Sequence, residues 1–361
     1  MPDLMPGALD LALEINSVRT SAGDSRYQLD KLWEPLRRIV PFVAAWIGVF
    51  DPERRQHLTA TALEHGEVNR RYLESRAFND QVEAMGLFEQ RRPMRLCDAA
   101  LPPAGLPSRA EYWWPAGYRE GLGVPLVARD GRHLGLMTLH TASSVRPTDA
   151  ARDVIEMVAP LIAAAIDPMS TIAGLSGLVA DAQACVVISR TGSVHALPGM
   201  PSHPLLDPGS PVADIALGKL TNHRTHAAFL CPSPGDDGQD GYVRVTAVTC
   251  PPDAPHFFTA LIMISPPGDL HGLTRRELEV LGLLIDGCAN QRIASTLYIT
   301  ERTVAAHLEH IRAKLGVPTR TAAAVRSLHQ VLYVPHQLID MHIRPPVGSS
   351  ADRQQLTTLL R

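Results

Sequence analysis

Apolar positions along the chain follow two periods, one typical of helices and one typical of strands. From Leu29 to Ile39 they recur at three- and four-residue spacings, which predicts one face of a helix. The run 43–50 is almost continuously apolar and ends at Asp51, and 57–63 follows it, so we predict two paired strands. The polar stretch 68–78 is predicted to be helical, and the proline-rich stretch 101–107 to be a loop.

A β-hairpin is the sharpest local signal in the first half of the chain. Residues 122–128 and 134–140 are rich in Val and Leu, and Asp130 and Gly131 lie between them. Such a pair favours the positive φ angles of tight hairpin turns. A helix with its apolar face between Val154 and Ile166 follows. These elements predict a domain of helices and strands over residues 29–168, after a flexible lead-in at 1–28.

A second region of strands is predicted over residues 171–265. Residues 184–189 and 194–197 are apolar runs on either side of a turn, and 242–250 and 257–265 predict a second hairpin. The prolines between 198 and 211 predict a segment without regular structure, because proline cannot donate a backbone hydrogen bond. The polar stretch 232–241 is predicted to be a loop and 266–269 a linker.

The segment 268–335 predicts four helices. Thr274 and Glu277 form a capping box ahead of an apolar face, and Gly287 ends that helix. Asn290 is the predicted cap of a second, short helix, and Thr300 caps a third that runs to Leu315. A fourth helix is predicted to stop before proline 335 and to use an apolar face made by Ala322, Val325, Leu328 and Leu332. Residues 336–361 are predicted to be a loose tail.

A short helix, a tight turn and an amphipathic third helix predict a helix-turn-helix that fits the major groove of DNA. Val304, Leu308, Ile311 and Leu315 form the inward stripe of the third helix. The predicted base contacts come from the opposite face, and the predicted phosphate contacts from nearby cations. The base candidates are Thr303, Ala306 and His310, and the phosphate candidates are Arg302, Arg312, Lys314 and Arg320.

The segment 273–325 resembles the LuxR-type (GerE-like) helix-turn-helix, on the basis of Leu273-Thr274, Arg276-Glu277, Gly287, Asn290, Ile293-Ala294, Thr303-Val304, His307, Lys314-Leu315 and Arg320. The resemblance implies a four-helix DNA-binding domain, double-stranded DNA as partner and a homodimer formed through the last helix. The sequence departs from the family at Ala305, where a lysine is usual, at Arg292, where a glutamate is usual, and at Glu309. Residues 273–325 carry seven cations and five anions. Since phosphate neutralisation provides much of DNA affinity, a non-enzymatic adaptor that no longer binds DNA stays open as an alternative.

Residues 29–168 resemble a GAF domain through Trp46–Asp51, Gly123–Leu126, Asp130-Gly131 and the helix that follows. The resemblance implies an α+β sensor domain, and 171–265 resembles a PAS fold, also α+β. Trp46, Tyr112, Trp113, Trp114 and Tyr118 are either the wall of a small-molecule pocket or rings buried in the core. The expected fold is thus multidomain, with two α+β domains and an all-α C-terminal domain.

Composition narrows the remaining function classes. The five cysteines share no CxxC spacing and fit reduced thiols, and Cys97 is interpreted as a buried small residue rather than a redox sensor. The first residues lack the pattern of a signal peptide, and no apolar run of about 18 residues occurs, so we expect a cytoplasmic protein with no membrane partner. No catalytic or nucleotide-binding motif is found, so we predict no enzyme activity, no metal and no cofactor.

Overall fold

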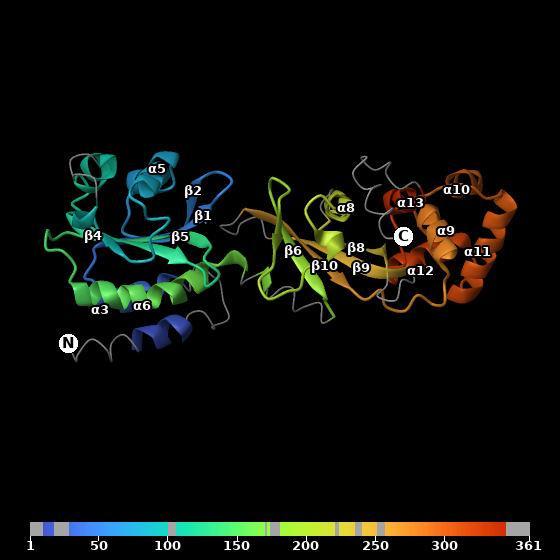
Figure 1. The fold of residues 1–361 in the computed structure, drawn as a ribbon, viewed down its shortest axis with the longest axis horizontal. Helices are drawn as coiled ribbons and strands as arrows, with labels where there is room; N and C mark the ends of the chain where they lie inside the picture. The colour runs from blue at the N-terminus through green and yellow to red at the C-terminus, as the bar shows by residue number, and fades with distance from the viewer. Residues whose placement is uncertain are drawn as a thin grey trace, which may run out of the picture. The chain divides into compact units, whose positions relative to one another are not determined.

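The computed structural model describes residues 10–17, 29–99, 106–169, 172–173, 181–220, 224–234, 240–250 and 257–343. The chain divides into two compact units, drawn as ribbons in Figure 1. One unit contains residues 1–172 and 252–257, and the other contains 173–251 and 258–361. The middle region and the C-terminal helices therefore belong to the same unit. Within the described part of the chain, no helix is both long and apolar enough to cross a bilayer.

The first unit is built on a five-stranded antiparallel sheet with the order β2-β1-β5-β4-β3. The strands are β1 (Ala44–Asp51), β2 (Gln56–Leu63), β3 (Met94–Arg95), β4 (Glu120–Val127) and β5 (His133–Thr141). The predicted hairpin is confirmed, since β4 and β5 pair directly and Gly131 has a φ of 91° in their turn. The loop predicted at 101–107 lies largely outside the described residues.

Helices cover both faces of this sheet, as Figure 1 shows. α3 (Trp33–Ile39) and α6 (Asp149–Ile166) lie on one face, and α4 (Glu67–Leu73), α5 (Arg76–Ala84) and the helical turn η3 (Ser108–Trp113) lie on the other. Side chains alternate along β1: Ala45 and Ile47 join the core beneath α6, while Ala44 and Trp46 join the core beneath α5. The sheet is thus buried on both faces, which explains the nearly continuous apolar run of β1.

The predicted flexible lead-in contains an ordered helix at residues 10–17. Leu11 is 3% exposed and Ile15 is fully buried, and both belong to the core on the α3 and α6 side of the sheet. The prediction was wrong for this segment because two apolar residues four positions apart are enough for one short helix to pack. The rest of the lead-in lies outside the described residues.

The second unit contains another five-stranded antiparallel sheet, with the order β7-β6-β10-β9-β8. Its strands are β6 (Ala184–Ser189), β7 (Val194–Ala196), β8 (His226–Pro234), β9 (Asp240–Thr249) and β10 (Phe258–Ser265). Numbered within each sheet, its strand order is the same as in the first unit. The strand β8 was missed in the sequence, and it pairs with β9 across the segment predicted to be a loop.

The proline-rich stretch of the second unit is more regular than predicted. A helical turn, η4 (Pro204–Leu206), is followed by α8 (Pro211–Lys219). Ser210 caps α8 by accepting from the backbone N–H of Val212, and Pro211 occupies the first helical position. Proline is tolerated there because the first N–H groups of a helix have no intrahelical partner. The prediction was wrong because it treated every proline as a helix breaker.

Five helices complete the second unit: α9 (Arg275–Ile285), α10 (Asn290–Leu297), α11 (Glu301–Leu315), α12 (Arg320–His329) and α13 (His336–Ile343). The capping box of Thr274 and Glu277 is present, and Thr300 caps α11. Asn290 is not a cap: Ala289 holds that position, with no side-chain hydrogen bond.

The end of the helical region differs from the prediction in two ways. The face of α12 that is buried carries Ala323 and Ser327, while Val325 and Leu328 are exposed. The predicted loose tail begins with α13, whose Leu338 and Ile339 are buried in the core of the unit. The remainder of that tail lies outside the described residues.

The segment between α12 and α13 connects the helices to the middle sheet. The backbone N–H of Leu230, on β8, donates to the carbonyl oxygen of Tyr333 at 2.7 Å. The Tyr333 hydroxyl donates to Asp286 at 2.8 Å and accepts from Lys219 at 2.6 Å. A Cβ added to Gly282 would lie 2.3 Å from the carbonyl oxygen of Val334. A larger residue would therefore force this segment away from α9.

Candidate nucleic-acid interface and sensor cavity

The turn between α10 and α11 has the geometry of a helix-turn-helix. Tyr298 ends α10 in the left-handed region, with a φ of 54°. Two residues later Thr300 is extended, and its hydroxyl accepts from the backbone N–H of Thr303 at 3.2 Å. This sharp change in direction is what sets α11 across α10.

The two faces of α11 differ in burial as predicted. Val304, Leu308, Ile311 and Leu315 are buried. Exposed positions follow the other face and include the predicted base contacts, which are Thr303, Ala306 and His310, together with Arg302, Ala305 and Glu309. The helix therefore presents a continuous polar and small-residue face to solvent, which is the requirement for insertion into a groove.

The three arginines predicted to contact phosphates differ in the partners that they have within the chain. Arg312 donates to the carbonyl oxygen of Pro318 at 3.1 Å, and Arg320 donates to that of Cys288 at 3.3 Å. Both bonds use one guanidinium nitrogen, which leaves other donors for a phosphate. Arg302 is exposed at the first turn of α11, and the described residues offer its side chain no hydrogen bond or ion pair.

Lys314 has a structural partner that the sequence did not reveal. Its Nζ lies 2.6 Å from a carboxylate oxygen of Glu277 and 2.9 Å from the carbonyl oxygen of Gly272. The Glu277 side chain is 4% exposed. Burial raises the pKa of Glu277, but the hydrogen bonds from Lys314 and Thr274 outweigh burial, so the pKa lies below its ordinary value. Lys314 therefore stabilises the packing of α11 on α9.

The first unit contains a cavity of about 40 Å³ between the sheet and the helices α5 and η3. We call it the sensor cavity. Its surface is almost entirely apolar, and the residues around it include Phe78, Val82, Leu87, Met94 and Leu136 together with Arg95, Trp113, Thr138 and His140.

Four residues around the sensor cavity carry buried polar atoms that have no hydrogen-bond partner within the described structure. These atoms are Arg95 Nε, Trp113 Nε1, Thr138 Oγ1 and His140 Nε2. Each of the four residues is between 4% and 6% exposed. Burying a polar group without a partner costs about 1–3 kcal/mol. The cavity surface itself is almost entirely apolar and these atoms are inaccessible from it, so the cavity does not supply their missing partners.

Four of the five predicted pocket aromatics share one apolar cluster, but only Trp113 lines the cavity. Trp46 is fully buried, and its Nε1 donates to Thr59 at 2.9 Å. Tyr112 stacks on Tyr72 at 3.8 Å. The Tyr118 hydroxyl donates to the carbonyl oxygen of Glu64 at 3.1 Å.

Trp114 lies apart from these rings, half exposed against Arg109. Thr138 and His140, which also lie around the sensor cavity, were missed in the sequence. Their signal was two polar residues at alternate positions of the apolar strand β5, which places both on one face.

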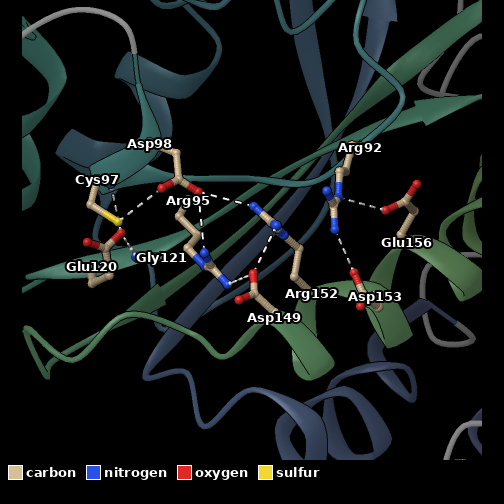
Figure 2. Close-up of polar contacts among 10 residues, drawn as sticks. All are labelled: Arg92, Arg95, Cys97, Asp98, Glu120, Gly121, Asp149, Arg152, Asp153 and Glu156. Carbon is tan, nitrogen blue, oxygen red and sulfur yellow. Dashed lines mark hydrogen bonds and ion pairs between the residues drawn. The ribbon is translucent and has the colours of Figure 1, made fainter.

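Arg95 links the sensor cavity to the start of α6, as Figure 2 shows. Its guanidinium lies 2.7 Å from Asp149 and 3.6 Å from Asp98. Arg152, one turn into α6, binds the same two carboxylates at 3.0 Å and 3.2 Å. The hydrogen bond from Arg95 and its charge hold the pKa of Asp149 below its ordinary range. Arg95 and Arg152 thus share two carboxylates, which ties the end of β3 to the first turn of α6.

Cys97 lies beside this network and is exposed, against the prediction of a buried thiol. Partial burial, together with the charges of Glu120 and Asp98, raises the pKa of its thiol. A raised pKa suppresses the reactive thiolate. Partial burial and the neighbouring carboxylates thus both act against a redox role for Cys97, although its side chain is exposed rather than buried as predicted. Among the described residues, no group of His, Cys, Asp and Glu is arranged to hold a metal ion.

The fold and exposed face of α9 to α12 define a helix-turn-helix domain. Residues 271–327 match the family model of bacterial regulatory proteins of the luxR family, and residues 29–167 match that of the GAF domain. The chain therefore carries an N-terminal GAF domain and a LuxR-type helix-turn-helix domain.

Several curated regulators share the helix-turn-helix. It is 51% identical over 59 residues to the transcriptional regulatory protein DegU of Brevibacillus brevis, covering 16% of this chain and 25% of that protein. It is 47% identical over 58 residues to the nitrate/nitrite response regulator protein NarP of Escherichia coli, covering 16% and 27%. The chain thus spans about a quarter of the length of these relatives.

The solved structures that match the chain have low sequence identity and low TM-scores. The GAF domain of a phosphoenolpyruvate-protein phosphotransferase from Coxiella burnetii is 20% identical, with a TM-score of 0.37 over 48% of this chain and 97% of that one. A structure of VqmA bound to DPO is 19% identical, with a TM-score of 0.25 over 47% and 92%. Similarities at this level carry no argument about function.

Proposed function

We propose that the chain is a DNA-binding transcriptional regulator in which the GAF domain controls the LuxR-type helix-turn-helix. The observation that carries the proposal is the face of α11, where Arg302, Thr303, Ala306 and His310 are all exposed opposite a buried apolar stripe. Arg302, Arg312 and Arg320 supply the phosphate contacts in this proposal, and Lys314 acts mainly by holding α11 in place. The chain would act in the cytoplasm and catalyse no reaction.

The proposal includes a homodimer formed through α12. Val325 and Leu328 are about half exposed and lie three residues apart, so they form one apolar face of that helix. Two copies of a helix-turn-helix reading the two halves of a palindromic site require such a contact between subunits. Residues 273–325 carry only seven cations against five anions, so the second copy is important for affinity.

The middle sheet is proposed to be a PAS-like module over residues 171–265. Its strand order, which repeats that of the first sheet, supports this proposal. Its role would be to transmit movement to the helices α9 to α13, because its core is continuous with theirs. A shift of the sheet would then move the helix-turn-helix as well.

DNA binding by the full-length protein tests the proposal. Fluorescence anisotropy with the upstream region of its own gene, measured from about 50 to 200 mM salt, should show binding that weakens steeply with salt. An unrelated duplex of the same length is the control for sequence preference. Equal binding to both duplexes would indicate a DNA-binding protein that does not recognise the upstream region of its own gene.

The alternative is an adaptor whose helix-turn-helix no longer binds DNA. The exposed Ala305 and Glu309 on the groove-facing side of α11 favour it, because neither attracts a phosphate. Absence of binding at about 50 mM salt would favour the adaptor. Ala305→Lys adds one cation to the same face and should then restore measurable binding if charge alone was missing.

A further inference from the structure

A groove of about 340 Å³ lies between the β4–β5 hairpin and the middle of α6, outside the sensor cavity. Its volume is at the lower end of the range of small-molecule pockets, which is about 300–1,000 Å³. In contrast to the sensor cavity, both polar and apolar atoms are accessible in it. Its apolar residues are Pro125, Val127, Ala128, Ala159 and Pro160, and its charged residues are Arg91, Arg129 and Glu156.

Two carboxylates beside the groove already have cationic partners. Glu156, which lines the groove, lies 3.2 Å from Arg92, as Figure 2 shows. Asp130, which follows Arg129 in the hairpin turn, lies 2.8 Å from Arg132. These acidic groups are therefore neutralised by arginines other than the two that line the groove.

Arg91 and Arg129 keep their charges available to a ligand. Both side chains are exposed, and the described residues offer neither guanidinium a hydrogen bond or an ion pair. Nη2 of Arg91 would lie 3.8 Å from a Cβ added to Gly131, so this guanidinium reaches the turn that carries Arg129. Two cations without partners and one carboxylate that has a partner favour an anion in the groove. Guanidinium groups bind carboxylate and phosphate oxygens through paired N–H groups.

The apolar residues of the groove favour an anion that has a hydrocarbon body. An exposed ion pair by itself contributes little to affinity, because water and salt screen it. An inorganic anion would contact the arginines and leave the apolar surface in water. An organic body that covers this surface removes it from water and so stabilises the complex. The charged head and the apolar body must therefore act together.

We propose that this groove binds a small organic acid, whose carboxylate or phosphate group pairs with Arg91 and Arg129 and whose apolar body packs on the hairpin and on α6. The site is separate from the sensor cavity, and its occupancy does not depend on DNA binding. Its occupant would contact both the β4–β5 hairpin and the helix that ends the GAF domain.

Methyl nuclear magnetic resonance of the full-length protein, measured without DNA, tests this assignment. The readout is the methyl signals of Ala128 and Ala159, which line the groove and are assigned by their loss in Ala128→Ser and Ala159→Ser. The probes are 3-phenylpropionate and phenyl phosphate. The matched molecules are 3-phenylpropan-1-ol, which has the apolar body without the charge, and inorganic phosphate, which has the charge without the body.

At least one of the two acids should shift both methyl signals in a saturable way at millimolar concentration, because a small ligand in an open groove binds weakly. The alcohol and inorganic phosphate should each bind at least about tenfold more weakly than that acid. The absence of a saturable shift with either acid would overturn the proposal, and so would equal binding of the alcohol or of inorganic phosphate.

Substitution of the two arginines separates their charge from the shape of the groove. Arg91→Gln and Arg129→Gln should each weaken binding of the acid about threefold or more, and the double variant about tenfold or more, with binding of the alcohol unchanged. Both side chains are exposed, so the variants should fold as the original protein does. Arg54→Gln, at an exposed turn of the same unit, is the matched control and should bind the acid normally. Acid binding that survives the double variant would contradict the assignment.

Discussion

Two cations on the same helix illustrate how differently similar residues act. Arg302 at the start of α11 is exposed, whereas Lys314 near its end binds the buried carboxylate of Glu277 at 2.6 Å. A lysine ammonium that already has a buried partner contributes less to an external phosphate. The sequence predicted both residues as phosphate contacts because it showed only their charge and their helical position.

Replacing Arg302 should weaken DNA binding without affecting stability. Arg302→Ala removes one phosphate contact, so we expect affinity to fall about three- to tenfold and the salt dependence to decrease by about one ion. Anisotropy titrations at several salt concentrations measure both quantities. Arg54→Ala, on an exposed turn of the first unit, is the control. An unchanged salt slope would show that Arg302 does not contact DNA.

Replacing Lys314 should instead destabilise the helix-turn-helix. Lys314→Met leaves the Glu277 carboxylate buried without its cation, which we expect to lower the free energy of unfolding by about 1–2 kcal/mol after allowing for the exposure of Lys314. Urea denaturation near neutral pH measures this loss. Lys314→Arg keeps the charge and should retain most of the stability. The assignment fails if the methionine variant is as stable as the original protein.

The same pair determines a pH dependence. The pKa of Glu277 in the folded chain is below its ordinary value of 4.5. The stabilisation by Lys314 is therefore fully present above that value and is lost as the pH falls through the lower folded pKa. The difference between the original protein and the Lys314→Met variant should consequently shrink in acid.

At the scale of elements, α12 shows how tertiary packing chooses a helix face. The sequence offered Val325 and Leu328 as core residues because they are apolar and correctly spaced. The structure instead buries Ala323 and Ser327, whose small side chains allow α12 to lie close to α9. Ser327 satisfies its hydroxyl by donating to the carbonyl oxygen of Ala323 at 2.7 Å. The larger residues are left on the exposed side, where a second copy could cover them.

A charge on that exposed face should prevent dimerisation. Leu328→Glu should give a monomer with an unchanged melting temperature, because Leu328 is 55% exposed in the single chain. DNA binding should weaken as well, since each subunit would bind alone. Sedimentation velocity measures the oligomeric state, and Val68→Glu, at an exposed position of α4, is the matched control. If Leu328→Glu remains a dimer, the subunits pair elsewhere.

At the scale of the whole molecule, buried histidines make the first unit sensitive to acid. Burial lowers the pKa of His57 to about 3, with a further contribution from the charge of His133. Burial also lowers the pKa of His65 and of His133 to about 4, and places that of His140 well below its ordinary value. These rings surround the aromatic core on the α5 side of the sheet, where a charge has no water to stabilise it.

The GAF domain should therefore lose stability as the pH falls. The unfolded chain takes up protons below about 6.5, while the folded chain takes them up only near the lowered values. Stability is thus fully present above pH 6.5 and decreases from there towards 4. Each histidine contributes up to about 1.4 kcal/mol per pH unit.

Thermal unfolding, followed at several pH values between 6.5 and 4, measures how steeply the stability falls with pH. His57→Phe should make the slope shallower because one site of proton uptake is removed. His329→Ala, at an exposed position of α12, should leave it unchanged. A melting temperature that does not vary with pH would contradict the assignment.

The sequence by itself determined the elements whose signals are local. The hairpin around Gly131, the capping box at Thr274 and the buried stripe of α11 follow from turn chemistry, caps and spacing, which neighbours in the chain specify. The turn and the third helix of the helix-turn-helix were therefore predictable, including the exposed face that is proposed to contact DNA, whereas the cap of α10 and the buried face of α12 were not.

Only the tertiary structure decided which residues meet across the chain. Arg95, Trp113, Thr138 and His140 come from three separate segments and surround one cavity, because the sheet order places β3 and β5 on either side of β4 and Trp113 of η3 packs into the same core. The same kind of long-range packing pairs Lys314 with Glu277 and buries the apolar residues of α13 in the core. A sequence shows the charge and apolarity of each residue, but burial depends on what the folded chain places against it.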